Sequence, residues 1–219
     1  MLASGIIAVV RLTQPVSLEA AARTLAGAGV RAFEITLTTP GALDAIARLA
    51  GSASLGECLV GAGTVLDERS AEDVIAAGAR FVVSPTLNPG VLRLCRDKDV
   101  VCMPGALTPT EILAAWHAGA QVVKLFPAAA VGPRYLKDVL APLEFLRIVP
   151  SGGVTLDNAG DWIRAGAAAV SVGTDLVNAA TVREGAEAEL AARARAFVDR
   201  VAEARRELAG GGRGGARRE

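Results

Sequence analysis

The sequence predicts an α/β protein built as a (β/α)8 barrel (TIM barrel) with a long C-terminal helix. Two observations favour this architecture. The dipeptide Ala-Gly followed by an apolar run occurs at residues 28, 77, 118 and 165, and glycine there suits the left-handed turn that ends a helix. Apolar runs and helical patterns also alternate along the chain, as in parallel sheets whose strands are buried on both faces. An open, doubly wound sheet is the alternative.

Eight candidate strands follow from these patterns. Each is an apolar run that leads into glycine, proline, a hydroxyl residue or a charged residue. In chain order they lie within residues 6–10, 28–35, 58–60, 77–83, 100–103, 118–125, 146–149 and 165–172. Eight strand–helix units in a chain of this length fit a compact barrel.

Helical patterns lie between the strands, over residues 17–28, 41–49, 70–77, 89–96, 109–118, 134–140 and 156–165. Asp67, Thr108 and Thr155 belong to the residue types that cap helix N-termini. Residues 182–208 are rich in Ala, Glu and Arg and predict a long amphipathic helix. We therefore expect a single barrel domain over residues 1–209. We expect the Gly- and Arg-rich residues 210–219 to be disordered.

The composition excludes several classes of protein. The 219 residues are 52% hydrophobic, which excludes a wholly disordered chain. The 23 Lys and Arg residues balance 23 Asp and Glu residues, so no broad field attracts nucleic acid or an anionic membrane. No apolar run is long enough to cross a membrane, and the first residues do not resemble a secretory signal. We expect a cytoplasmic protein that binds neither nucleic acid nor membrane.

Few residues are available for metal or triad chemistry. His117 is the one histidine, and we expect it at the C-terminal end of a helix, away from the strand ends, where it complements the helix dipole. Cys58, Cys95 and Cys102 lack zinc-ligand spacing and are too few for a disulfide framework. The sequence therefore predicts no metal site.

Lys124 differs from the other two lysines in its surroundings. Lys98 and Lys137 lie beside acidic residues in a loop and a helix, whereas Lys124 lies in an apolar strand. Strand alternation places it on the same face as Val122 and Phe126. Burial disfavours the charged ammonium, and a free amine is a nucleophile that forms a Schiff base with a ketone. A salt-bridged lysine or a phosphate clamp is the alternative.

Glu34 lies between Phe33 and Ile35 in another apolar strand. Buried carboxylates are rarely left unpaired. Glu34 is therefore expected to pair with Lys124 across the barrel, or to act beside it as a general acid/base. A structural ion pair with an arginine is the alternative.

Glycine-rich turns end the last two predicted strands. Gly152 and Gly153 follow one strand, and Gly173 follows the next. Bare glycine amides at neighbouring strand ends can hold a phosphate in this fold. Tight turns with no ligand are the alternative.

The ordered set of strand-end motifs resembles one enzyme family. The motifs are Phe33-Glu34-Ile35-Thr36-Leu37, Gly61-Ala62-Gly63-Thr64-Val65-Leu66, Ser84-Pro85, Met103-Pro104-Gly105, Val123-Lys124-Leu125-Phe126-Pro127-Ala128, Ser151-Gly152-Gly153-Val154 and Val172-Gly173-Thr174. Over residues 6–201 the chain resembles the class I aldolases of 2-keto-3-deoxy-6-phosphogluconate (KDPG) and 4-hydroxy-2-oxoglutarate (KHG).

The resemblance implies a homotrimeric barrel that needs no cofactor and no metal. It implies reversible cleavage of KDPG to pyruvate and glyceraldehyde 3-phosphate, or of KHG to pyruvate and glyoxylate. In this family the equivalent of Lys124 forms the Schiff base, and the equivalent of Glu34 is the acid/base, working through a water molecule. The other implied contacts are Arg11 and Thr64 to the substrate carboxylate, Thr38, Pro85, Phe126 and Ser151 to the substrate, and Gly152, Gly153, Gly173 and Thr174 to the phosphate.

One position departs from the family pattern. The phosphogluconate branch commonly has an arginine where this chain has Thr38, and a threonine cannot supply that charge. Arg11, which follows the first strand, can supply that charge. The phosphogalactonate branch has an arginine at the same place. A 2-keto-3-deoxy-6-phosphogalactonate aldolase is therefore an alternative. A non-catalytic phosphometabolite-binding barrel and a phosphosugar isomerase or decarboxylase with Glu34 as base are two others.

Overall fold

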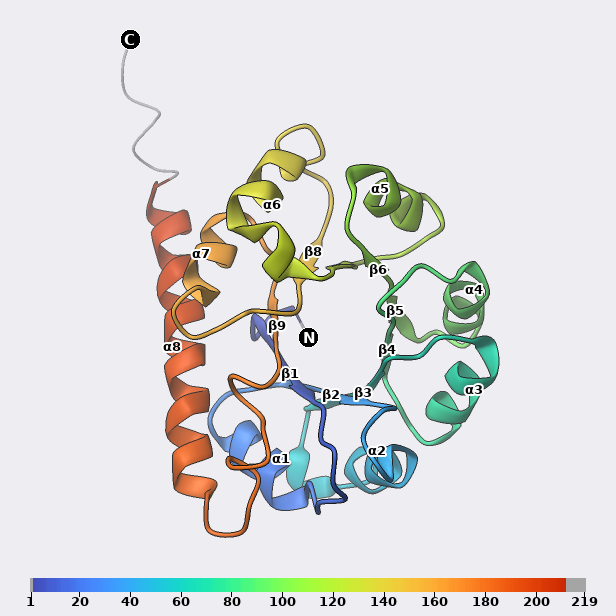
Figure 1. Ribbon diagram of the computed structural model, residues 1–219, viewed down its shortest axis with the longest axis vertical. Helices are drawn as coiled ribbons and strands as arrows, with labels where there is room; N and C mark the ends of the chain where they lie inside the picture. The colour runs from blue at the N-terminus through green and yellow to red at the C-terminus, as the bar shows by residue number, and fades with distance from the viewer. Residues whose placement is uncertain (1, 212–219) are drawn as a thin grey trace.

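The computed structural model describes residues 2–211 of the chain. A ring of short parallel strands lies at its centre, with helices around it (Figure 1). The strands are β1 (Ile6–Val10), β2 (Ala32–Thr36), β3 (Leu59–Gly63), β4 (Phe81–Val83), β5 (Val101–Met103), β6 (Gly105–Ala106), β7 (Val123–Leu125), β8 (Ile148–Pro150) and β9 (Val170–Val172). Hydrogen bonds join them in the orders β5-β4-β3-β2-β1-β9 and β6-β7-β8.

Two junctions close these sheets into one barrel. Pro104 separates β5 from β6, and its carbonyl accepts a hydrogen bond from the Lys124 N–H at 2.9 Å. At the other junction, Ser151 forms a parallel bridge with Ser171 of β9. The predicted barrel is confirmed. The strand predicted at residues 100–103 is β5, and the short strand β6 after it was not predicted. Pro104 separates the two, because proline has no N–H to contribute to a strand ladder.

The helices on the outside are α1 (Glu19–Gly27), α2 (Ala42–Ala50), α3 (Glu68–Ala76), α4 (Pro89–Asp97), α5 (Pro109–His117), α6 (Gly132–Leu140) and α7 (Ala159–Arg164). Two of the predicted caps are confirmed. The Asp67 carboxylate accepts a hydrogen bond from the Ser70 N–H at 2.7 Å. Thr108 and Glu111 form a reciprocal capping box at the start of α5.

The predicted start of a helix at residue 156 is wrong, because α7 begins at Ala159. Thr155 still makes the contacts of a capping residue, since its hydroxyl accepts from the Asn158 N–H at 3.4 Å and its carbonyl accepts from the Ala159 N–H at 2.9 Å. The Thr155 N–H donates to the Asn158 side chain at 2.9 Å, and the Leu156 N–H donates to the Asp175 carboxylate at 2.8 Å. These contacts fix a loop where the sequence pattern predicted the first turn of a helix.

The last helix, α8 (Glu187–Gly211), runs along one side of the barrel beside α7 and α1 (Figure 1). It begins later than the predicted residue 182, because residues 183–186 form a turn in which the Ala186 N–H donates to the Arg183 carbonyl and Gly185 has a φ of 78°. It extends past the boundary expected at residue 209, and the rest of the segment expected to be disordered lies outside the described residues. No helix in the part of the chain that the structure describes could cross a membrane.

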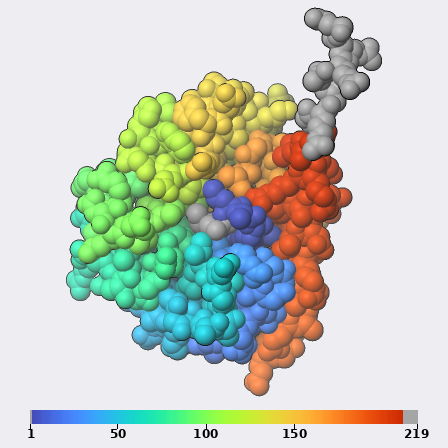
Figure 2. All heavy atoms as spheres, turned by 180° about the vertical axis from the view of Figure 1, so that it is seen from behind, coloured from blue at the N-terminus to red at the C-terminus, as the bar shows by residue number. Residues whose placement is uncertain are grey.

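The apolar core has two parts. A large layer packs between the strands and the helices. A smaller cluster fills the barrel itself and includes Ile7, Phe81, Met103 and Val149, with Leu2 packed against it. Seen from behind, the first residues that the structure describes, in dark blue, lie at the centre of the ring (Figure 2). The amino end of the barrel is therefore filled by apolar side chains, and polar groups collect at the carboxyl end.

Candidate active site

Lys124 and Glu34 meet inside the barrel. Lys124 lies on β7 and Glu34 on β2, and the two side chains are 5% and 0% exposed. The Lys124 Nζ atom is 3.9 Å from Glu34 Oε1. The expected pairing of these residues is therefore observed, and it joins strands on opposite sides of the barrel.

The Glu34 carboxyl is in an unusual electrostatic setting. Neither of its oxygens has a hydrogen-bond partner among the described residues. Burial raises the pKa of Glu34 above its usual range, and the positive charges of Lys124 and Arg11 oppose this shift. A carboxyl with a raised pKa holds its proton more readily than an exposed one, which suits a group that must both accept and return a proton.

An aromatic ring lies beside the lysine. Lys124 Nζ is 5.0 Å from the centre of the Phe126 ring, and the Phe126–Pro127 peptide bond is cis. The amine is thus surrounded by one carboxylate, one aromatic face and apolar strands. This setting excludes much of the water that would otherwise solvate it.

The strand ends surround a cleft of about 350 Å³. The predicted site residues that line it are Arg11, Lys124, Phe126, Ser151, Gly152, Gly153, Gly173 and Thr174. Glu34 does not line the cleft itself and is fully buried beside Lys124, which does. The structure therefore brings the predicted nucleophile and the predicted phosphate loops to one cavity.

Arg11 lines the cleft. Its Nη2 atom donates to the Thr64 hydroxyl at 3.4 Å, so these two predicted residues are neighbours although Thr64 does not line the cavity. Thr38 and Pro85 do not line it either. The Thr38 hydroxyl lies 2.9 Å from that of Thr36, in the turn after β2.

The loop after β8 has its carbonyl groups occupied. The Gly152 carbonyl accepts from the Ala129 N–H at 2.9 Å, and the Gly153 carbonyl accepts from the Asn158 side-chain amide at 2.9 Å. Both glycines have positive φ, 86° and 79°, which other residues rarely adopt. A loop held in this way can offer N–H groups, but no free carbonyl, to a ligand.

The loop after β9 is arranged similarly. The Gly173 carbonyl accepts from the N–H of Leu176 at 2.9 Å, and the Thr174 carbonyl accepts from the Asn178 side-chain amide at 2.9 Å. Two neighbouring loops that line the cleft therefore have these carbonyl groups engaged within the protein. The N–H groups of such loops suit an anion such as a phosphate.

Four lining residues were not predicted: Val9, Val154, Thr155 and Asp175. Val9 could have been found from strand alternation, because it precedes Arg11 on the inward face of β1. Val154 and Thr155 directly follow the glycine pair, and Asp175 directly follows Thr174. Their sequence signal is only proximity to a predicted loop.

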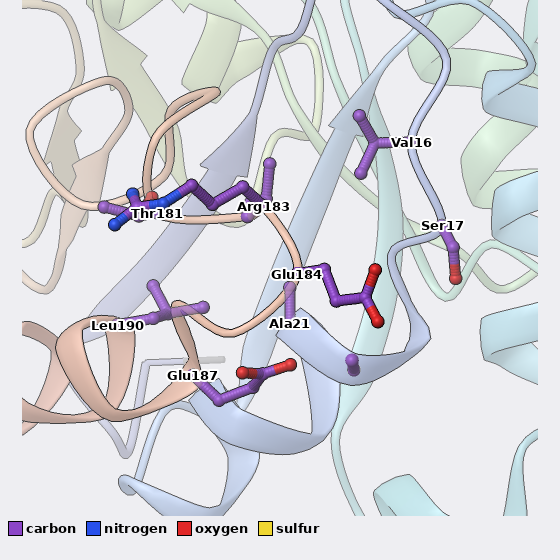
Figure 3. Close-up of a pocket in the computed structure, with 10 residues that line it drawn as sticks. Val16, Ser17, Ala21, Thr181, Arg183, Glu184, Glu187 and Leu190 are labelled. Atoms are coloured by element: carbon purple, nitrogen blue, oxygen red, sulfur yellow. The ribbon is translucent and has the colours of Figure 1, made fainter.

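A second cavity, of about 300 Å³, lies on the flank of the barrel (Figure 3). Val16 and Ser17 lie on one side of it, and Arg183, Glu184 and Glu187 lie on the other. None of the predicted site residues lines this cavity. The cleft at the strand ends is therefore the candidate active site.

The residue types that commonly bind metal ions do not gather at the cleft. Within residues 2–211 no group of three or more His, Cys, Asp and Glu side chains could hold a metal ion. His117 is exposed in the last turn of α5, as predicted. The cysteines are free, with Cys95 and Cys102 buried and Cys58 half-buried.

Comparison with known proteins agrees with this geometry. A family model described as KDPG and KHG aldolase matches residues 1–192. The chain is 36% identical over 202 residues to a 2-dehydro-3-deoxy-phosphogluconate aldolase of Pseudomonas aeruginosa, with 92% of this chain and 91% of the relative covered. It is 32% identical over 197 residues to the 2-dehydro-3-deoxy-6-phosphogalactonate aldolase of Escherichia coli K12, with 90% and 96% covered.

A solved structure of similar fold is the KDPG aldolase of Legionella pneumophila, with pyruvate captured at low pH as a covalent carbinolamine intermediate. Its TM-score is 0.80 at 27% identity, and the match covers 90% of this chain and 95% of that one. By its sequence, its barrel and its relatives, this chain belongs to the KDPG and KHG aldolase family of aldehyde-lyases.

Proposed function

We propose that the protein is a class I aldolase that cleaves a 2-keto-3-deoxy-6-phospho sugar acid to pyruvate and glyceraldehyde 3-phosphate. The observation that carries the proposal is the buried Lys124 amine, which lines the cleft and lies 3.9 Å from the buried Glu34 carboxylate. A buried amine beside an acid/base is what imine formation and retro-aldol cleavage require.

The reaction begins at the ketone. Lys124 Nζ adds to C2 of the substrate to give a carbinolamine, which loses water to form an iminium ion. The C4 hydroxyl then gives its proton, through a water molecule, to Glu34. The C3–C4 bond breaks, its electron pair flows to the iminium nitrogen to form an enamine, and glyceraldehyde 3-phosphate leaves.

The second half of the cycle returns the enzyme to its starting state. Glu34 gives the proton back, through water, to C3 of the enamine. Water then hydrolyses the resulting imine, which releases pyruvate and the free Lys124 amine. A pyruvate carbinolamine, the species captured in the Legionella relative, is the intermediate that forms when water adds to this imine.

The residues around the cleft suit both charged groups of such a substrate. Arg11, which donates to Thr64, is proposed to hold the carboxylate and to supply the positive charge. The loops at Gly152–Gly153 and Gly173–Thr174, which line the same cleft, are proposed to hold the phosphate through N–H donors.

We propose KDPG as the substrate and its C4 epimer, 2-keto-3-deoxy-6-phosphogalactonate, as the second candidate. Arg11 favours the second candidate, because the phosphogalactonate branch resembles this chain in having an arginine at the end of the first strand. The relatives carry both names. The test is kcat/KM for the two epimers and for 4-hydroxy-2-oxoglutarate, measured on one preparation.

The proposed chemistry is tested by borohydride trapping. Reduction in the presence of pyruvate is expected to add one pyruvyl group, located on Lys124 by peptide mapping. Lys98 and Lys137 serve as internal controls, because both lie outside the cleft. K124M should give no adduct and no turnover. A folded wild-type protein that binds phosphate esters but forms no adduct would favour a binding barrel or a phosphosugar isomerase.

We further propose a homotrimer, as the family resemblance implies. Exposed apolar side chains give some support, since Leu43, Leu66, Phe145 and Leu208 are each more than 40% exposed in the single chain. Light scattering after size-exclusion chromatography tests it, and a mass of one chain would refute it.

A further inference from the structure

Asp175 joins both candidate phosphate loops to the last helix. It directly follows Thr174 and lines the cleft. One carboxylate oxygen accepts from the Leu156 N–H at 2.8 Å, in the loop after β8. The other oxygen is paired with the Arg193 guanidinium of α8, which also donates to the Asp175 carbonyl. One side chain thus ties together three elements that are far apart in the sequence.

The two contacts of the carboxylate have different consequences. The bond to Leu156 fixes the spacing between the loop that contains Gly153 and the loop that contains Thr174. The pair with Arg193 anchors both loops to α8, a helix packed along the side of the barrel. Because N–H donors bind an anion only when they point to one place, this spacing decides how well a phosphate is held.

The charges around the cleft are also unusual. Arg11 and Lys124 are the cationic residues among those that line the cavity, and Asp175 is the acidic one. An unpaired carboxylate beside the two loops would repel a phosphate. Arg193 cancels that charge, and the pair is only partly exposed, at 28% for Asp175 and 38% for Arg193.

We infer that Asp175 and Arg193 are a positioning pair that makes this cleft specific for phosphorylated substrates. Arg193 neutralises Asp175, and Asp175 holds the two loops at the spacing that a phosphate group needs. Neither residue takes part in the chemistry at Lys124. The inference rests on the proposed function of the cleft, and it assigns to α8 a role in substrate choice.

The test compares a phosphorylated and an unphosphorylated acceptor in the condensation with pyruvate. In R193M the Asp175 charge is uncompensated, so KM for glyceraldehyde 3-phosphate should rise about tenfold or more, while KM for glyoxylate should stay within about twofold. In D175N/R193M the charge is gone and a carbonyl oxygen remains to accept from Leu156. Most of the increase in KM should therefore disappear.

The matched control is R195M, an equal loss of charge on the same helix at an exposed residue. It should leave both KM values unchanged. An R193M variant that weakens both acceptors equally, or a double variant no better than R193M, would overturn the inference. Thermal unfolding of each variant separates a loss of folding from a change in KM.

A second measurement keeps the inference separate from the proposed chemistry. Glycerol 3-phosphate carries the phosphate but cannot form an imine, so its Kd, measured by calorimetry, reports the loops alone. R193M should raise this Kd about tenfold, and D175N/R193M should restore it. If the wild type binds this probe but traps no pyruvate, the proposed function fails and the Kd comparison still tests the pair. Equal Kd values for wild type and R193M would refute the pair.

Discussion

The Glu34 carboxylate lies directly against the backbone of Gly63 on the neighbouring strand. A Cβ atom built on Gly63 would be 2.0 Å from Glu34 Oε1, far inside van der Waals contact. The register pairs Thr36 with Gly63 and Glu34 with Gly61. Both glycines of the Gly61-Ala62-Gly63 motif therefore lie beside β2, the strand that contains Glu34. The absence of a side chain at Gly63 therefore makes room for the buried acid.

We predict that G63A displaces Glu34 and slows the reaction. The added methyl group cannot coexist with the carboxylate in its present position, and overpacking of this kind typically costs about 1–3 kcal/mol. We expect kcat for cleavage to fall at least about tenfold, which corresponds to a loss of about 1.4 kcal/mol in transition-state stabilisation. Pyruvate trapping on Lys124 should persist, because the amine itself is not displaced. Steady-state kinetics and borohydride trapping measure the two effects.

The control for this change is G27A. Gly27 lies in α1, has no neighbouring atom within 4 Å of a built Cβ, and has an ordinary backbone φ. Alanine there should leave kcat unchanged and stabilise the helix by about 0.5–1 kcal/mol. A G63A enzyme with the wild-type kcat would show that the position of Glu34 does not matter for catalysis.

The buried Glu34 also makes a prediction about pH. Its pKa is raised in the folded protein above the ordinary value of 4.5, first because of burial. The folded state therefore holds its proton more strongly than the unfolded state. The contribution of Glu34 to stability is fully present below pH 4.5 and is lost as the pH rises through the folded pKa. Compared with E34Q, the wild type should lose stability in this window, by at most about 1.4 kcal/mol per pH unit.

Glu111 provides a control of opposite sign. Hydrogen bonds from Thr108 and Leu107 lower the pKa of Glu111 below 4.5. Its contribution is therefore present above that pH and is lost as the pH falls through the folded pKa. Urea unfolding of wild type, E34Q and E111Q across the acid range measures both slopes. If the difference between wild type and E34Q did not vary with pH, the raised pKa of Glu34 would be wrong.

The capping box of α5 predicts a stability change without a change in activity. Thr108 accepts a hydrogen bond from the Glu111 N–H at 3.3 Å and donates to its carboxylate at 2.9 Å. T108A removes both contacts and should cost about 1 kcal/mol, or about 2–4 °C in Tm for a protein of this size. T108S keeps the hydroxyl and should stay close to wild type. An unchanged Tm for T108A would show that the capping box contributes nothing measurable.

Much of the fold could be predicted because its signals are local. Each Ala-Gly repeat marks a helix end followed by a buried strand, and the glycines Gly29, Gly78, Gly119 and Gly166 all have positive φ. The start of α7 was misplaced for a physical reason. Thr155 is a good capping residue, but the neighbouring backbone bonds to Asp175, which lies 19 residues further along the chain. No local pattern reveals a contact of that kind.

The site residues also divide into those with a local signal in the sequence and those without one. Lys124 and Glu34 could be identified because each is a charged residue inside an apolar strand, which is costly unless the charge is used or paired. Asp175 could not, because its role depends on Arg193 in a helix packed from outside the barrel. The substrate contacts expected of Thr38 and Pro85 stay predictions, since strand-end sequence does not say which end residues turn into the cleft.

The last prediction concerns the proposed contact of Arg11 with the substrate carboxylate. Arg11 donates to the Thr64 hydroxyl at 3.4 Å. R11M removes a charged donor whose hydrogen bond to a carboxylate is worth about 1.5–3 kcal/mol, so KM for pyruvate should rise at least about tenfold. R11K keeps the charge but loses the planar fork of the guanidinium, so its KM for pyruvate should lie between those of the wild type and R11M. R80M removes an exposed arginine just before β4, at the other end of the barrel, and should change nothing. If R11M bound pyruvate as tightly as the wild type, the carboxylate would have to be held by a residue other than Arg11, and the argument for the phosphogalactonate substrate would lose its support.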